Sequence, residues 1–182
     1  KKTGFILLDR KVSIQLGLWK TSTKLYKAPS KLMIRTGLFH SIKAMSKKGA
    51  LILEFETPVN KKDLVRFKDK YGRQSRSYEG SKYTKKVGSR LIKFEHPKIG
   101  KNKKYNINNL EVSLEIHKNF KNLTKKNDKT ISAILNGKIV DKKGQCVISH
   151  GEIVKTSTLK KLSEVFKIDK QLTILRVSKK KI

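Results

Sequence analysis

The apolar residues of this chain come in short runs that are separated by Gly, Pro, Asn, Asp and Lys. Short runs that alternate with polar residues, or that end at turn-forming residues, are typical of β-strands. No run approaches the roughly 18 apolar residues that a membrane-spanning helix needs. The pattern therefore predicts an all-β fold without a membrane span, with strands over residues 5–8, 12–16, 32–34, 50–57, 91–94, 110–116 and 172–177.

Local signals place turns and one helix among these strands. Residues 9–11 have the length of a hairpin connection between the first two strands. Asn136-Gly137 supplies the positive φ of a type I′ turn and predicts a hairpin over residues 131–140. Residues 157–166 carry apolar side chains at helical spacing, so we expect one short helix there.

Composition divides the chain into two units. Residues 60–90 are polar and rich in Ser, Lys and Gly, which predicts an irregular connection anchored by its aromatic residues. Residues 98–109 are rich in Lys and Asn, which predicts a linker. We therefore expect a first unit over residues 1–97 and a second unit over residues 110–182.

A weak internal repeat relates the two units. The segment Thr3–Ile14 resembles Thr130–Asp141, which begins 127 residues later. The strand Leu51–Glu54 resembles Thr173–Arg176, which begins 122 residues later. The match lies mostly in the hydrophobic pattern, and two copies of one antiparallel β unit explain it most simply.

The chain is strongly basic. It has 45 Lys and Arg against 14 Asp and Glu, a formal net charge of +31. Such a charge attracts polyanions, so non-specific binding of nucleic acid is expected at low salt. The Lys are scattered in twos and threes, which is also typical of a solvated surface. One Cys excludes an internal disulfide framework, and the lack of a leader pattern predicts a cytoplasmic protein.

The segment Pro29–Glu56 resembles the cupin superfamily, which consists of small jelly-roll β-barrels. Residues 37–40 keep the Gly-x-x-His of cupins and end at His40, and residues 29–31 stand at the turn that precedes it. Residues 51–73 share Glu-Thr-Pro, Leu-Val-Arg and Lys-Tyr-Gly-Arg, in this order, with a cupin subgroup associated with sugar-nucleotide and sugar-phosphate metabolism. The resemblance implies two cupin-like barrels in tandem, the first of which lacks its opening strands.

A cupin metal site uses three His and one Glu, a donor set that suits first-row divalent metals. By this resemblance, His40 is the one ligand left in the first unit, because the His-x-His segment would lie before Lys1 and Thr3 stands at the Glu position. In the second unit Thr130 stands at that position and no Gly-x-x-His follows. One imidazole does not hold a catalytic metal, so we expect no metal and no cofactor.

Arg and Tyr gather once in the chain, within and next to the polar connection, at Arg66, Tyr71, Arg73, Arg76 and Tyr78. Arg binds phosphate oxygens through two N–H groups at once. Aromatic rings such as Tyr add stacking and cation–π contacts. The cluster is therefore a candidate ligand site for a sugar phosphate or a nucleotide. The alternative is that the same side chains pack the connection onto the barrel.

These observations favour a binding protein of the cupin type over an enzyme. The predicted ligand is a sugar phosphate or a nucleotide sugar, and the resemblance also implies a homodimer. One alternative is a sugar-phosphate isomerase or epimerase, which needs polar groups around an acid–base His40 inside the barrel. Another is a polyanion-binding protein on a β-barrel scaffold, which needs Lys gathered on one face.

Overall fold

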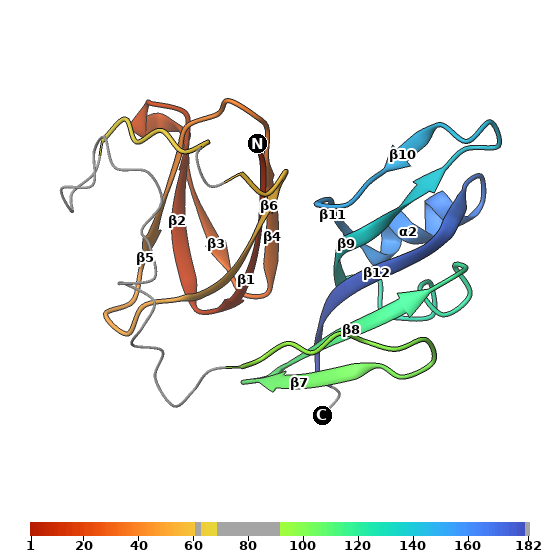
Figure 1. Cartoon of the computed structure of the whole chain (residues 1–182). Coiled ribbons are helices and arrows are strands. Elements are labelled where there is room, and N and C mark those ends of the chain that lie inside the picture. The colour runs from red at the N-terminus through yellow and green to blue at the C-terminus, as the bar shows by residue number, and fades with distance from the viewer. Residues whose placement is uncertain (61–62, 69–91, 181–182) are drawn as a thin grey trace.

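The structure of this chain is a computed structural model that describes residues 1–60, 63–68 and 92–180 (Figure 1). The described part is mostly β and forms three antiparallel sheets, none of which closes on itself. The predicted all-β class is therefore confirmed. The finer expectation of two jelly-roll barrels is not confirmed by these open sheets.

The first 57 residues form two three-stranded sheets, with the orders β4-β1-β6 and β3-β2-β5. Their elements are β1 (Lys2–Asp9), β2 (Lys11–Leu16), η1 (Lys20–Ser22), β3 (Thr23–Lys27), β4 (Ser30–Ile34), β5 (His40–Ala44) and β6 (Leu51–Thr57). Leu7, Val12 and Ile14 form the centre of the core between the two sheets.

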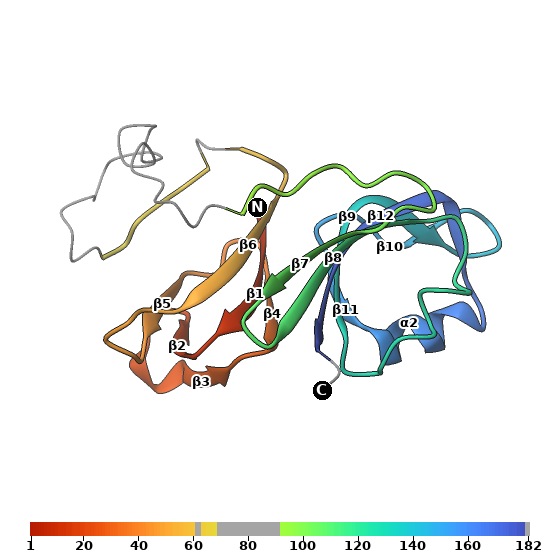
Figure 2. The same ribbon diagram turned by 90° about the horizontal axis from the view of Figure 1, so that it is seen from below.

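The second half forms one sheet with the order β10-β9-β12-β8-β7, and β11 also pairs with β9. Its elements are β7 (Lys103–Ile107), β8 (Leu110–His117), β9 (Ile131–Val140), β10 (Cys146–Ile148), β11 (Ile153–Lys155), α2 (Thr156–Ser163) and β12 (Lys167–Lys179). One face of this sheet packs against the sheet β4-β1-β6 (Figure 2). Leu123 of the β8–β9 connection and Leu159 of α2 belong to the core on the other face.

β1 lies at the centre of this layered arrangement. Leu7 packs between the first two sheets, whereas Ile6 and Leu8 pack against the second half. A strand that is buried on both faces needs apolar residues at every position, which explains the unbroken run from Phe5 to Leu8. Two polar contacts join the same halves: the Lys31 ammonium donates to the Ile153 carbonyl oxygen at 2.7 Å, and Lys2 pairs with Glu152 at 2.5 Å.

The internal repeat is present as two ladders of strands with the same register. In the first ladder β1 pairs with β6 and β4, and in the second ladder β9 pairs with β12 and β11. The pair Gly4↔Phe55, moved by the sequence offsets of 127 and 122 residues, becomes Ile131↔Val177. The four pairs that follow it in β1–β6 and three pairs of β1–β4 also recur.

The two ladders share an irregularity as well. In the first ladder, Leu8 is an extra residue between two consecutive pairs, and Leu135 occupies the same place in the second. A β-bulge inserts one unpaired residue and bends its strand. A shared register with a shared bulge is more specific than the hydrophobic pattern from which the repeat was predicted.

Beyond the bulge the ladders diverge, and both predicted hairpins are wrong there. β1 and β2 do not pair, because Arg10, with φ of 66°, turns the chain out of one sheet and into the next. β9 runs through Asn136-Gly137 as one strand, because residues on both sides of this pair are hydrogen-bonded to β12. The positive φ of Gly137 therefore serves a continuing strand, and a Cβ there would lie 2.0 Å from the Gln171 carbonyl oxygen.

Other local predictions need smaller corrections. The helix predicted over residues 157–166 is present as α2. The strand predicted over residues 91–94 is wrong for the described residues 92–94, which have no regular structure. The expected linker 98–109 contains β7, which pairs with β8 and so belongs to the second unit. β3 and β5 were not predicted, because each contributes few inward apolar side chains.

Candidate anion-binding pocket

An open pocket of about 440 Å³ lies where β1 turns into β2. Pockets of this size hold small-molecule ligands. Four parts of the chain line it: the β1–β2 corner, the end of β3, the β5–β6 connection and the turn between β7 and β8. The lining residues are Leu8, Asp9, Arg10, Lys11, Lys27, Ala28, Met45, Ser46 and Asn109.

Backbone hydrogen bonds fix the corner that forms the pocket. The Arg10 carbonyl accepts the Ala28 N–H at 2.9 Å, and the Lys11 carbonyl accepts the Met45 N–H at 3.1 Å. The Arg10 guanidinium donates through Nη1 to the Lys48 carbonyl oxygen at 2.8 Å. The same Nη1 lies 3.6 Å from the Asp9 carboxylate. Arg10 is thus held at the rim by neutral carbonyls and by one carboxylate.

Lys11 and Lys27 form the most unusual pair in the pocket. They are direct cross-strand partners on β2 and β3. Side chains in such positions lie about 4.5–5.5 Å apart at Cβ, and two like charges there destabilise the sheet. Both side chains are exposed, and neither has an ion-pair partner among the residues that the structure describes. An anion between them would remove this repulsion.

The second half contributes to the same pocket through Asn109. Asn109 belongs to the turn between β7 and β8, in which Asn108 has φ of 52°. Its carbonyl oxygen accepts the Lys180 N–H at 3.0 Å, so the chain after β12 passes next to the pocket. The pocket therefore lies between the first half of the chain and the β7–β8 turn, and the exposed Lys179 and Lys180 add to its positive field.

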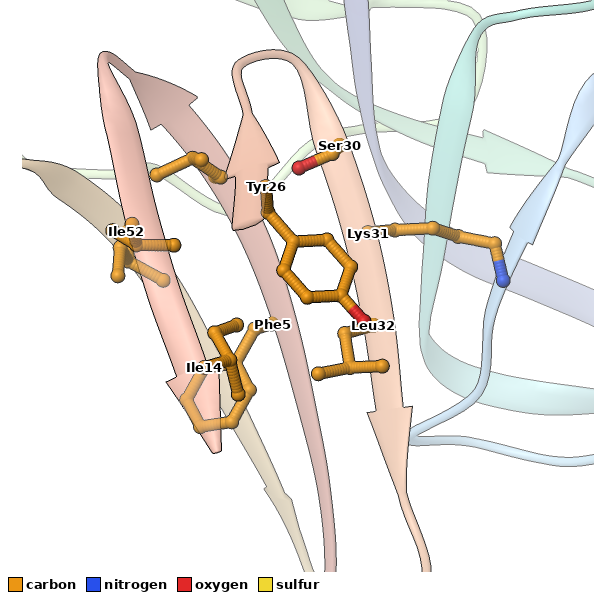
Figure 3. Close-up of a pocket in the computed structure, with 9 residues that line it drawn as sticks. Phe5, Ile14, Tyr26, Ser30, Lys31, Leu32 and Ile52 are labelled. Carbon is orange, nitrogen blue, oxygen red and sulfur yellow. The ribbon is translucent and has the colours of Figure 1, made fainter. Parts of the chain in front are cut away.

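His40, the predicted acid–base residue, lies at the start of β5 and is exposed. Its Nδ1 is 3.2 Å from the Leu38 carbonyl oxygen, and the Phe5 ring stands edge-on at 5.6 Å. The interior next to it is apolar and filled, with a cavity of about 10 Å³ (Figure 3). A cavity that small holds at most one water molecule. Among the described residues, the polar groups that an isomerase needs around His40 are therefore not gathered there.

The predicted Arg/Tyr cluster is only partly described. Arg66 is half-buried in the segment that follows β6. Tyr71, Arg73, Arg76 and Tyr78 lie outside the described residues. The cluster therefore stays a prediction. Sequence reasoning missed the pocket residues Lys11 and Lys27, because their pairing depends on the register of β2 with β3 and leaves no spacing signal in the sequence.

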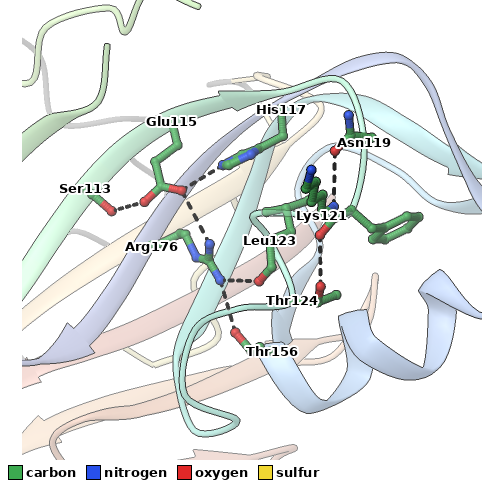
Figure 4. A network of polar contacts seen from close by, with 10 residues as sticks. Ser113, Glu115, His117, Asn119, Lys121, Leu123, Thr124, Thr156 and Arg176 are labelled. Atoms are coloured by element: carbon green, nitrogen blue, oxygen red, sulfur yellow. Dashed lines mark hydrogen bonds and ion pairs between the residues drawn. The ribbon is translucent and has the colours of Figure 1, made fainter. Parts of the chain in front are cut away.

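A buried polar network lies on the helix-covered face of the second sheet (Figure 4). The Arg176 guanidinium pairs with Glu115 at 3.4 Å and donates to the Leu123 carbonyl oxygen at 2.7 Å. Ser113 and His117 donate to the same carboxylate at 2.6 and 2.7 Å. Burial alone would raise the pKa of Glu115, but these hydrogen bonds and the Arg176 charge outweigh it and lower the pKa to about 2. The Glu115 carboxylate and both Nη groups of Arg176 have partners, whereas the buried Nε of Arg176 has none among the described residues. The network joins β8, β12 and the start of α2, which indicates a structural role.

In residues 1–60, 63–68 and 92–180, no three or more His, Cys, Asp or Glu side chains come together to form a metal site. No helix in the same residues has the length and the hydropathy to cross a membrane. Comparison of the chain with protein-family models, with curated proteins and with solved structures found no match.

Proposed function

We propose that this chain is a binding protein for a small phosphate-bearing ligand, such as a sugar phosphate or a nucleotide sugar, and that the ligand binds in the pocket at the β1–β2 corner. The observation that carries this proposal is the adjacent pair Lys11 and Lys27, two cations without carboxylate partners in the described part of the chain. Arg10 adds a third cation, fixed at the rim.

The chemistry of the other lining groups supports a ligand that also carries hydroxyl groups. The phosphate would accept hydrogen bonds from the two Lys ammonium groups and from the free N–H groups of Arg10. Ser46 and Asn109 offer neutral donors and acceptors on the same wall. Asp9 is the one carboxylate among the lining residues, and Arg10 lies beside it. This set of groups suits binding better than acid–base catalysis.

The shared register and bulge of the two ladders support the further proposal of two cupin-like units in tandem. The sequence resemblance supplies the family and the class of ligand. Each unit is an open assembly of sheets, and the faces that carry Ile6 and Leu175 pack on each other within one chain. The homodimer and the cytoplasmic location stay predictions.

The test is the binding of glucose 1-phosphate, measured by calorimetry at low salt, with glucose as the uncharged probe. Lys11→Gln and Lys27→Gln each remove one charge-assisted hydrogen bond, which contributes about 1.5–3 kcal/mol, so each weakens binding about tenfold or more. Lys138→Gln is the matched control, because Lys138 stands at the place of Lys11 in the second repeat and pairs with Asp169. Equal losses in all three variants would show that net charge alone attracts the phosphate.

A further inference from the structure

The sheet β3-β2-β5 lies entirely within a stretch of the chain that has no acidic residue. Residues 10–53 contain no Asp or Glu and ten Lys or Arg. The sheet and all of its connections therefore carry positive charge without an internal counter-charge. This segregation is not visible in the net charge, because Asp and Glu occur throughout the rest of the chain.

The outer face of this sheet carries the exposed cations. Val12, Ile14, Tyr26 and Ile42 point into the core, so their neighbours along each strand point outward. The outward side chains include three Lys and three small polar residues: Lys11, Lys27, Lys43, Ser13, Gln15 and Ser41. All three Lys are exposed and have no ion-pair partner among the described residues.

Large apolar groups are exposed on and beside this face. Leu25 points outward from β3 and is 69% exposed. Trp19 is 76% exposed, and it lies in the β2–β3 connection, at the end of the face where Gln15 pairs with Thr23. Lys20 follows Trp19 in the same connection and is exposed. A Trp ring that is mostly exposed, next to a Lys without an ion-pair partner among the described residues, has no evident role in holding the fold together.

We propose that the outer face of the sheet β3-β2-β5 binds single-stranded nucleic acid. Proteins that bind single strands combine a cationic surface for the phosphates with aromatic side chains on which bases stack. Lys11, Lys27 and Lys43 supply the cationic surface. Trp19 supplies the aromatic ring on which a base can stack. Ser13, Gln15 and Ser41 offer hydrogen bonds to sugar and phosphate oxygens. At about 3.3 Å per residue, Lys11 and Gln15 lie roughly 13 Å apart along β2, so the face spans several nucleotides.

A single strand fits this face better than a duplex or a membrane. A duplex keeps its bases stacked inside, so an exposed Trp gains nothing from it. Surface-binding membrane segments are amphipathic, with a strongly apolar face that enters the lipid. Apart from Leu25, this face carries Lys, hydroxyl and amide side chains, so it has no strongly apolar surface.

The chain provides its own probe, because Trp19 is its one Trp. An oligodeoxythymidine of about 12 nucleotides, added to the full chain at low salt, is expected to quench and shift the Trp19 fluorescence. With a labelled oligonucleotide, Trp19→Ala is expected to weaken binding about tenfold. Lys43→Gln is expected to reduce the slope of log K against log salt by about 0.7.

Lys142→Gln is the matched control, because Lys142 is an exposed Lys in a turn of the second half. It removes the same charge and is expected to leave the salt slope nearly unchanged. An equal effect of Lys43→Gln and Lys142→Gln would overturn the proposal in favour of net charge. So would tighter binding to a duplex, or a Trp19 shift with anionic phospholipid vesicles but none with the oligonucleotide.

Lys11 and Lys27 belong both to this face and to the proposed pocket, but the variants that test this inference lie outside the pocket. Trp19 and Lys43 do not line the pocket. Their variants should therefore bind glucose 1-phosphate like the unchanged chain, so one proposal can fail while the other stands. Both positions are at the surface, and circular dichroism with thermal unfolding checks that the variants fold.

Discussion

The two ladders of this chain share their strand register and differ in structure beyond the bulge. Both have the same register and the same bulge, and a residue with positive φ stands at the same place in each, Arg10 in the first and Gly137 in the second. After Arg10 the chain leaves its sheet, and after Gly137 it stays paired with β12. Continued pairing requires Gly, because the Gln171 carbonyl lies where a Cβ would be. One backbone position thus decides whether the repeat makes one long strand or two sheets.

The interiors of the two repeats differ in polarity. Phe5 and Glu54 face each other in the first ladder, and Ser132 and Arg176 take their places in the second. Arg176 is 2% exposed, because β8 pairs with β12 on its far side and brings Glu115 to it. Glu54 is exposed, and β6 is the last strand of its sheet in the described part of the chain. In the part of the chain that the structure describes, the buried Arg therefore lies where a fourth strand supplies its partner.

The largest effect is expected from breaking the polar interior of the second repeat. Arg176→Met leaves the Glu115 carboxylate buried without its ion-pair partner, which costs about 3–5 kcal/mol of unfolding free energy. Glu54→Gln, at the equivalent place in the first repeat, is expected to change it by less than about 1 kcal/mol. Urea unfolding of both variants measures the difference.

The double variant Glu115→Gln, Arg176→Met checks the cause. Removing both charges also removes the uncompensated carboxylate, so most of the lost stability should return. A double variant as unstable as Arg176→Met would mean that the methionine packs badly, and that the charge is not responsible.

Low pH should also affect the stability of the two repeats differently. The folded-state pKa of Glu115 is about 2, below its unfolded value near 4.3. The group therefore contributes stability above pH 4.3, and this contribution disappears as the pH falls towards 2, a loss of up to about 3 kcal/mol. Glu115→Gln lacks this term, so its unfolding free energy should fall less over that range. Parallel pH curves for the two proteins would contradict the lowered pKa.

These contrasts show which features can be predicted from a sequence of this kind. Short apolar runs, some of them alternating with polar residues, identified β1, β6, β8 and β12, because burial acts directly on side-chain pattern. The repeat was found for the same reason. The different backbone roles of Arg10 and Gly137 were not predicted, because a residue with positive φ fits a turn, a corner or a bulge equally well. The pocket and the network were missed because they join residues that are distant in sequence, such as Lys11 with Lys27 and Glu115 with Arg176.

The role of Gly137 can be tested directly. In Gly137→Ala the new Cβ meets the Gln171 carbonyl oxygen at 2.0 Å, and the backbone keeps φ of 88°. The clash and the strain together should lower the unfolding free energy by about 2 kcal/mol or more. Arg10→Gly, at the equivalent corner, loses the hydrogen bond to the Lys48 carbonyl but gains freedom at φ of 66°, so it should change stability by less than about 1 kcal/mol. Thermal unfolding that ranks the variants in the opposite order would contradict the close approach of Gly137 to the Gln171 carbonyl.

The smallest expected change in unfolding free energy has opposite signs at two equivalent lysines. Lys11 stands opposite Lys27, whereas Lys138, at the same place in the second repeat, pairs with Asp169 at 3.4 Å. Lys11→Gln relieves a repulsion and should raise the unfolding free energy by about 0.2–0.5 kcal/mol. Lys138→Gln removes an exposed ion pair and should lower it by a similar amount. Both differences should shrink in about 1 M NaCl, where the screening length is roughly 3 Å. A stabilisation by Lys11→Gln that survives in high salt would mean that the Lys11–Lys27 repulsion is not its source, and would remove the main electrostatic argument for an anion in the pocket.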